Sequence, residues 1–348
     1  MVIRGVRLLC LGILLLGLGW TAAAGEASTW YPLSDHYDGR RFHNDRPVPT
    51  FMDHLRWLAA METVPWPAWI DDPVQQKPVP IVGKGSLRVT YVNHATVLIQ
   101  MDGLNVLTDP VWSERAGPFG LTGAKRVRMP GVSLDDLPVI HLVLISHDHY
   151  DHLDLPTLEK IVRRDNPVVL AGLRVKDCMP QAASGRVVDM DWWQTYRHDA
   201  SGVRFTFVPA FHSSGRGFFD TDRTLWGGFV VEGARHRVYF AGDTAWGGFL
   251  EAIARRFPEF SLTIFPVGSY EKRWFMKNQH MNPEDAVRAH VLLRSRQSMG
   301  MHYATFAEHP EQAIDAHEKD LAAAVARHKI ALSSFWLLGF GEGRDVGE

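Results

Sequence analysis

Short apolar runs alternate with turn-forming residues over most of the chain from residue 86 onward. LRVTYV, ATVLIQM and LNVLTD are rich in β-branched residues and are separated by Asn93-His94 and Asp102-Gly103, which predicts an antiparallel meander. The run VIHLVLI at 139–145 is almost entirely apolar, which is typical of a strand buried on both faces. Later strands alternate with helices. The pattern therefore predicts two sheets sandwiched between helices in one domain, an α/β (α+β) fold.

Helices are expected where the apolar spacing lengthens behind a capping residue. One is predicted at 51–61 and another at 155–164, with Asp154 as its cap. A third begins at Asn282, which is followed by a proline at the first helical position. Residues 110–138 have the composition of loops. The other expected elements are strands at 167–171, 186–190, 203–210, 225–233, 236–242, 261–267 and 297–303, and helices at 249–257 and 311–329.

The first 24 residues have the pattern of an export signal. Arg4 and Arg7 precede an apolar run at 8–20, and three alanines at 22–24 offer a small-residue cleavage site. The run is shorter than the about 20 residues that a membrane-spanning helix needs. A cleaved signal peptide is therefore favoured over an uncleaved membrane anchor. The expected location is exported, periplasmic or secreted, with membrane association through an uncleaved segment as the alternative.

The rest of the chain divides into two parts. Residues 25–85 are rich in proline and tryptophan and are expected to wrap around a catalytic domain at 86–345. The net charge of −2, without a dense run of Lys or Arg, gives no reason to expect nucleic acid as a partner. The two cysteines, Cys10 and Cys178, exclude a disulfide framework and a thiolate-rich zinc site. Seventeen histidines make imidazole and carboxylate the favoured metal ligands.

Metal-affine residues crowd into ISHDHYDHLD, directly after the predicted buried strand. His147 and His149 lie two apart, so their imidazoles point the same way, and Asp151 and His152 follow where the chain turns toward the next helix. These four ligands exceed the need of one catalytic zinc, which typically takes three protein ligands and a water. The surplus predicts two metal ions about 3.5–4 Å apart.

Further ligands are expected at the ends of later strands. His212 follows the strand VRFTFVPA, Asp243 follows HRVYFAG, and His302 follows SMGM. Each of these residues alone would more often be a surface group or a satisfied core group. Together with the cluster at 147–152 they predict a dinuclear centre at one edge of the sandwich.

Four segments, SHDHYDHLD, FHSS, AGDTAW and GMHYATF, resemble in order and spacing the metallo-β-lactamase superfamily. LRWLAAME, NHATVLIQMD, LTDPVWSERA and GSYEKRWFMKNQHMNPEDA are similar to segments of the N-acylphosphatidylethanolamine-hydrolysing phospholipase D family. The likeness runs from residue 40 to residue 340. It implies an αββα four-layer sandwich that holds two Zn²⁺ ions per chain. In that family's pattern one ion would be held by His147, His149 and His212, the other by Asp151, His152 and His302, with Asp243 bridging.

The resemblance also implies a reaction. A hydroxide bridging the two ions, one of them bound by Asp151, would attack phosphorus in line and convert N-acylphosphatidylethanolamine-like phospholipids to phosphatidic acid and N-acylethanolamine. The iron-dependent redox branch of the superfamily has Glu where this chain has His149. This difference favours zinc hydrolysis, because zinc does not change redox state. Manganese and iron remain open, since ligands of this type also bind them.

Four other residues are candidates for the site. The family places a substrate-contacting histidine at KNQH, so His280 is expected to contact the phosphate and assist the departing alkoxide; otherwise it makes a structural hydrogen bond. Tyr150 would donate to a phosphate oxygen or pack its ring. Asp109 is expected to orient a ligand imidazole, or to form an Asp-Pro turn, and His94 is a similar candidate.

Alternative functions remain open. The same centre would suit a lactonase or another ester or phosphate hydrolase acting on a small soluble substrate. A non-catalytic binding protein would also share the fold, although the intact ligand set is evidence against it. The apolar pairs Phe218-Phe219 and Phe275-Met276, with Trp274, are expected in the core; if exposed, they would accept acyl chains or contact a membrane surface. The sequence leaves acyl-chain preference and oligomeric state, including a homodimer, undecided.

Overall fold

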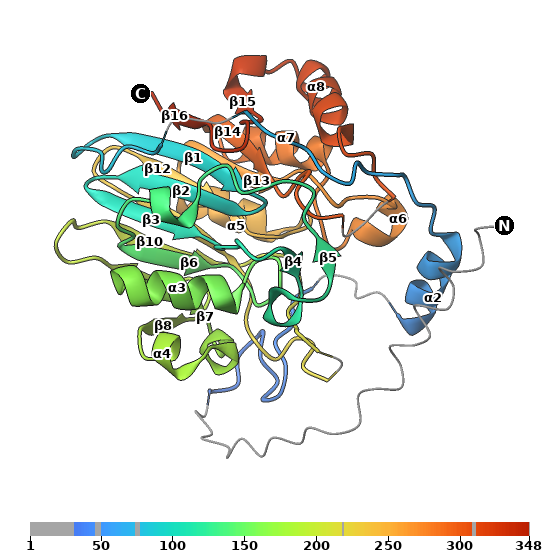
Figure 1. Ribbon diagram of the computed structural model, residues 1–348, viewed down its shortest axis with the longest axis horizontal. Coiled ribbons are helices and arrows are strands. Elements are labelled where there is room, and N and C mark those ends of the chain that lie inside the picture. The colour runs from blue at the N-terminus through green and yellow to red at the C-terminus, as the bar shows by residue number, and fades with distance from the viewer. Residues whose placement is uncertain (1–30, 46–49, 74–76, 218, 308–310, 348) are drawn as a thin grey trace.

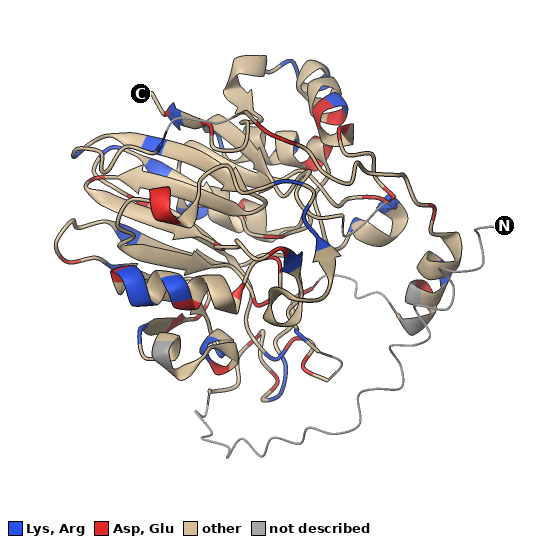
Figure 2. Cartoon of the chain, in the orientation of Figure 1, with Lys and Arg blue, Asp and Glu red and all other residues tan. Residues whose placement is uncertain are grey.

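Two seven-stranded sheets pack face to face with helices on their outer sides in the computed structural model (Figure 1). It describes residues 31–45, 50–73, 77–217, 219–307 and 311–347. This arrangement is the predicted αββα sandwich. Charged side chains are frequent on helices and loops and sparse in the sheets (Figure 2). That distribution is expected for strands that are buried on both faces.

The first sheet combines antiparallel and parallel strands. β1, β2 and β3 form the predicted antiparallel meander, and β3, β6, β7 and β8 run parallel. The strand order is β16 (Gly343–Asp345), β1 (Leu87–Asn93), β2 (Thr96–Met101), β3 (Leu104–Thr108), β6 (Leu142–Ile145), β7 (Val168–Gly172) and β8 (Val187–Met190).

The second sheet has the same mixed character. β9 to β12 are antiparallel, whereas β12, β13, β14 and β15 are parallel. Parallel strands bring their carboxyl ends to one edge of a sheet, which gathers the residues that follow them. The order is β15 (Phe335–Trp336), β14 (Ser295–Met301), β13 (Phe260–Pro266), β12 (Arg237–Phe240), β11 (Gly228–Glu232), β10 (Arg204–Val208) and β9 (Thr195–Arg197).

Helices cover both outer faces. α3 packs on the first sheet, and α7 contacts β13 and β14 of the second sheet. A two-stranded ribbon of β4 (Arg115–Ala116) and β5 (Ala124–Lys125) lies apart from the sheets. The helices are α2 (Phe51–Ala60), α3 (Leu155–Asp165), α4 (Gln181–Ser184), α5 (Phe249–Arg256), α6 (Arg273–Met276), α7 (Pro283–Leu292) and α8 (Ala316–His328).

Strand β6 places the metal-affine segment on a rigid support. Leu142 and Leu144 belong to the apolar core between the sheets, whereas Val143 and Ile145 pack in the cluster that includes α3. The strand is therefore buried on both faces, as predicted. Burial of each of these apolar side chains contributes about 2 kcal/mol to the stability of the fold. The chain leaves this fixed strand directly into residues 146–154.

Several predicted boundaries were wrong. The strand expected at 139–145 begins only at Leu142, and Val139 is 62% exposed. The helix expected at 311–329 begins at Ala316. Asp154 occupies the N-cap position of α3 but does not bond that helix's first amides; its carboxylate accepts from the backbone of Trp112 and Ser113 instead. The ribbon β4–β5 and the strands β9, β15 and β16 were not predicted, because two or three residues show no measurable periodicity.

The described part of 25–85 contacts the rest of the chain through two tryptophans. The indole of Trp57 in α2 stacks on Phe275 at 5.2 Å and donates to Glu311 at 2.7 Å. Farther along, the Trp66 indole donates to the carbonyl of Gln312. The predicted signal segment lies outside the described residues. Within the described ranges, no helix combines the length and apolar character needed to cross a membrane.

Candidate metal centre

The predicted ligands follow four strands whose carboxyl ends meet at one edge of the sandwich. Residues 147–152 follow β6, His212 follows β10, Asp243 follows β12, and His302 follows β14. Five of the seven predicted ligands are buried, and the other two, His149 and Asp151, are partly exposed. The structure thus brings together residues that are up to 155 positions apart, from 147 to 302. Their role as metal ligands stays a prediction.

Three histidines form the first group. His147 Nε2 lies 2.8 Å from His149 Nδ1, and His212 Nε2 lies 3.2 Å from the same atom. The other ring nitrogens are already engaged: His147 Nδ1 lies 2.8 Å from the hydroxyl of Ser146, and His212 Nδ1 lies 3.0 Å from the carbonyl oxygen of Gln279. A carbonyl only accepts hydrogen bonds, so His212 Nδ1 donates and its Nε2 carries a lone pair. That lone pair faces the other two nitrogens, which is the arrangement a cation between them would satisfy.

Carboxylates and histidines form the second group. The Nε2 atoms of His152 and His302 each lie 3.3 Å from Asp151 Oδ2. Asp243 Oδ2 lies between the groups, 3.2 Å from His152 Nε2, 3.1 Å from His302 Nε2 and 3.8 Å from His212 Nε2. Asp243 therefore lies close to histidines of both groups, and its bridging role stays a prediction.

Unsatisfied buried atoms test whether a metal fits. His152 Nε2, His302 Nε2 and Asp243 Oδ1 are buried and make no well-aligned hydrogen bond within the described part of the chain, although both nitrogens lie near carboxylate oxygens. Buried polar atoms without partners cost about 1–3 kcal/mol each, so such a cluster is unfavourable unless a ligand occupies it. Imidazole and carboxylate donors in this number suit borderline divalent ions such as zinc. The residues present therefore fit the divalent metal ion that the fold implies.

The pKa values of His152 and His302 also reflect the negative charge gathered in this cluster. Burial opposes charge on His152, but the Asp243 and Asp151 carboxylates outweigh it and raise the pKa of His152 well above its usual value. Burial also opposes charge on His302, whose pKa nonetheless rises to about 10 beside Asp243. The two carboxylates therefore retain protons on their neighbouring imidazoles when no cation is bound. Metal binding would displace these protons, as is usual for such ligands.

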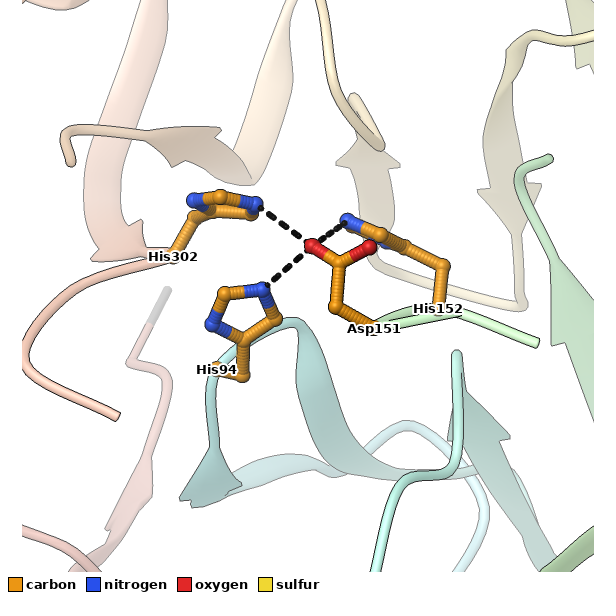
Figure 3. A group of neighbouring side chains, drawn as sticks. All are labelled: His94, Asp151, His152 and His302. Atoms are coloured by element: carbon orange, nitrogen blue, oxygen red, sulfur yellow. Dashed lines mark hydrogen bonds and ion pairs between the residues drawn. The ribbon is translucent and has the colours of Figure 1, made fainter. Parts of the chain in front are cut away.

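His94 is closer to the centre than sequence reasoning indicated. Its Nε2 lies 2.8 Å from Asp151 Oδ2 (Figure 3). Its backbone carbonyl also accepts a hydrogen bond from the amide of His302 at 2.8 Å. His94 sits in the β1–β2 turn with a positive φ of 45°. Burial and the neighbouring His302 lower its pKa to about 3, so it is neutral. A neutral His94 donates one hydrogen bond to the carboxylate that faces the second group.

Asp109, from the segment LTDP, contacts the predicted ligand His152, and its orienting role stays a prediction. Its Oδ2 lies 2.7 Å from His152 Nδ1, and the hydroxyl and amide of Ser146 also donate to this carboxylate. The equivalent partner of His212 is the backbone carbonyl of Gln279, which sequence reasoning missed. No side-chain type identifies such a partner, because every residue carries a carbonyl.

His280 and Tyr150 both line the cavity over the centre. His280 Nδ1 lies 3.7 Å from Asp243 Oδ2, and the guanidinium of Arg273 holds the His280 carbonyl at 2.7 Å. The hydroxyl of Tyr150 donates to the carbonyl of Arg216 at 2.9 Å. The expected contact of Tyr150 with a phosphate would require this hydrogen bond to be shared or broken. His280 is the better-placed candidate for the substrate.

A cavity of about 390 Å³ opens above the metal-affine residues. The volume of this cavity is in the range that binds a small molecule or part of a larger ligand. Of the apolar residues predicted for the core, Phe275 and Met276 are 7% and 3% exposed and line the cavity. Trp274 is 40% exposed and Phe219 is 84% exposed, so these two are not core residues; Phe218 lies outside the described residues. The site therefore has a polar floor and an apolar wall.

Comparison with known sequences identifies one matching family and two similar relatives. Residues 104–303 match the Beta-lactamase superfamily domain. The chain is 36% identical over 273 residues to N-acyl-phosphatidylethanolamine-hydrolyzing phospholipase D 1 of Caenorhabditis elegans, which covers 74% of this chain and 76% of that protein. It is 30% identical over 238 residues to the mitochondrial protein of the same name from Saccharomyces cerevisiae, covering 66% of this chain and 50% of that protein.

Solved structures agree on the fold. A structure titled as that of "a possible metal-dependent hydrolase" from Veillonella parvula superposes with a TM-score of 0.58 at 19% identity, covering 75% of this chain and 99% of that one. The superfamily match spans more than half of the chain, and it includes all seven predicted ligands. The chain therefore belongs to the metallo-β-lactamase superfamily of metallo-hydrolases, within the family of the N-acyl-phosphatidylethanolamine-hydrolyzing phospholipases D.

Proposed function

We propose that this protein is a dinuclear zinc phosphodiesterase of phospholipase D type. It hydrolyses N-acylphosphatidylethanolamine-like phospholipids to phosphatidic acid and N-acylethanolamine. Water adds to phosphorus, and the bond from phosphorus to the ethanolamine oxygen breaks. The observation that carries the proposal is the pair of ligand groups on either side of Asp243, beneath a cavity with an apolar wall. The 36% identity to a relative named for this reaction supports it.

The residues around the cavity have separate roles in the proposed reaction. His147, His149 and His212 would hold one ion; Asp151, His152 and His302 would hold the other. Bound zinc supplies Lewis acidity and lowers the pKa of water toward neutrality. His280, beside Asp243, is placed to contact the phosphate and to give a proton to the departing alkoxide. Phe275 and Met276 exclude water from one side of the cavity.

The test is an assay of the purified protein on N-acylphosphatidylethanolamine in detergent, with both products measured. Activity should disappear after chelation and return with Zn²⁺. His147→Ala and His302→Ala should each abolish it. Turnover that survives both substitutions contradicts the proposal.

A second candidate function keeps the centre and changes the substrate. A cavity of about 390 Å³ also accommodates a lactone or a small phosphodiester. A panel of lactones, cyclic nucleotides and glycerophosphodiesters separates the two candidates. A kcat/KM on a soluble substrate at least about 100-fold above that on the lipid would favour the second one.

We also propose that the protein is exported, contacts a membrane surface and forms a homodimer. The exposed side chains of Phe219 and Trp274 would contact a lipid surface, and Trp274 directly precedes Phe275 in the cavity wall. Vesicle co-sedimentation of wild type and Phe219→Ser checks this contact, and weaker binding of the variant is expected. N-terminal sequencing of the exported protein checks signal cleavage, and sedimentation equilibrium checks the dimer.

A further inference from the structure

The segment after His212 folds over the metal-affine loop at 147–152. Its Arg216 reaches both ends of that loop. The Nη1 atom of Arg216 donates to the carbonyl oxygen of Asp148 at 2.7 Å and to the carbonyl oxygen of Leu153 at 2.8 Å. Asp148 directly follows the first predicted ligand of the loop, and Leu153 directly follows the last one. One nitrogen atom thus joins the two ends of the ligand-bearing turn.

Hydrogen-bonding chemistry explains why an arginine occupies this position. Nη1 of a guanidinium carries two N–H groups in a fixed plane, so it can serve two carbonyls at once without rotation. Backbone carbonyls at the ends of a tight loop otherwise need water or a cation. A charged donor strengthens both bonds relative to a neutral donor.

Further contacts hold Arg216 itself in place. Its guanidinium carbon lies 4.0 Å from the centroid of the Tyr150 ring, and the Tyr150 hydroxyl donates back to the Arg216 carbonyl at 2.9 Å. The amide of Gly215 donates to Asp148 Oδ1 at 2.6 Å. Each of the two segments thus donates hydrogen bonds to the other: one segment carries His212, and the other carries the cluster at 147–152.

We propose that Arg216 is a positioning residue that fixes the two ligand-bearing segments relative to each other. It sets the affinity for metal by pre-organising His147, His149 and His212 as one group. The guanidinium does not line the cavity over the centre, so it acts through the loop and not on the substrate. This inference rests on the metal centre of the proposed function but not on the lipid substrate.

The test measures metal retention in the full chain loaded with Zn²⁺ or Co²⁺. Chelator competition is compared for wild type, Arg216→Ala, Arg216→Lys and Arg294→Ala. Arg294 is the matched control: it also donates to two backbone carbonyls, those of Pro258 and Ala254, but it precedes the amino end of β14, whereas His302 follows the carboxyl end.

Arg216→Ala should lose metal affinity by about 10- to 100-fold, the usual effect of removing a group that orients metal ligands. The visible spectrum of its Co²⁺ form should also shift. Arg216→Lys should recover part of the affinity, since it restores the charge but not the planar pair of donors. Arg294→Ala should keep wild-type affinity and spectrum even if its thermal stability falls.

Two results overturn the proposal. One is wild-type metal affinity and an unchanged Co²⁺ spectrum in Arg216→Ala. The other is an equal loss of affinity in Arg294→Ala, which would make the effect one of general stability. Should Arg216→Ala fail to fold, Arg216→Lys is judged by the same criteria against Arg294→Lys. Because no lipid is used, a protein inactive on phospholipid still yields a result.

Discussion

The Asp109 carboxylate lies 2.7 Å from Nδ1 of His152, and both side chains are fully buried. A carboxylate accepts hydrogen bonds, so Nδ1 is the donor and Nε2 is left to face Asp151 and Asp243. The relationship selects one tautomer and one ring orientation for a predicted ligand. It also shows how β3, which ends at Thr108 beside Asp109, contributes to a centre that it does not itself ligate.

Asp109→Asn should therefore weaken metal binding at the second group. The amide can present an N–H to His152 Nδ1, which favours the wrong tautomer. We expect metal affinity to fall about 10- to 100-fold, with activity falling in parallel at limiting metal. Metal content per chain after dialysis is the measurement. Asp165→Asn, which alters a buried carboxylate that accepts from the amide of Ile140, is the control and should retain its metal.

Asp243→Asn should have a larger effect, because Asp243 Oδ2 faces His152, His302 and His212 at once. Removing its negative charge leaves two cations less well neutralised. We expect the metal content to fall below two per chain and turnover to fall at least about 100-fold. Retention of two ions with near wild-type turnover would contradict the bridging role.

His94→Ala should weaken the second group without altering the pH profile between about pH 5 and pH 9. The pKa of His94, lowered to about 3 by burial and by His302, lies below that range, so His94 stays neutral throughout it. The loss of its hydrogen bond to Asp151 should lower metal affinity about 10-fold. His141→Ala, at a histidine that bonds the amide of Asn105, is the matched control. A changed pH profile would assign His94 a proton-transfer role instead.

His280→Ala should separate chemistry from metal binding. The predicted ligands remain in place, so two ions per chain are expected. Turnover should fall about 10²- to 10⁴-fold, the range typical for loss of a general acid. The kcat measured with saturating substrate, together with metal analysis, checks this expectation. Loss of metal in step with activity would instead make His280 a ligand, which its 3.7 Å approach to Asp243 allows.

Attachment of the N-terminal segment should depend on pH. His36 is bonded to Asp191 and Asp35 at 2.7 Å each and stacks on Trp192. Burial lowers its pKa, but the two carboxylates outweigh burial and raise it above 6.5. A raised pKa means that the contribution to stability is complete below 6.5 and is lost as the pH rises through the folded-state value.

The contribution should be below about 1 kcal/mol, because the Asp35 side chain is almost fully exposed and that of Asp191 is partly exposed. Thermal unfolding of wild type and Asp191→Asn, compared at about pH 5.5 and about pH 8.5, measures it. The difference between the two proteins should be larger at the lower pH. An equal difference at both values would show that His36 does not titrate in this range.

The sequence by itself determined the fold class and the residues available for the centre. Alternating apolar positions fix which faces of a strand are buried, so Leu142 to Ile145 identified a doubly covered strand with HDHYDH behind it. Ligand types are also readable, since few side chains bind divalent ions. The capping pattern at Asn282 predicted the start of α7, because the side chain and the amide that it caps are only three residues apart.

Tertiary structure decided everything that depends on distance between remote residues. The contact of His94 with Asp151, the carbonyl of Gln279 behind His212, and the reach of Arg216 across the ligand loop join segments between 57 and 67 positions apart. No periodicity encodes such pairs, and two of them use backbone atoms that every residue carries. Asp154 illustrates the same point: its local signal predicted a helix cap, yet the loop at 112–113 packs against it and takes its carboxylate. Local sequence patterns determine the secondary-structure elements, whereas tertiary packing determines which residues form hydrogen bonds with one another.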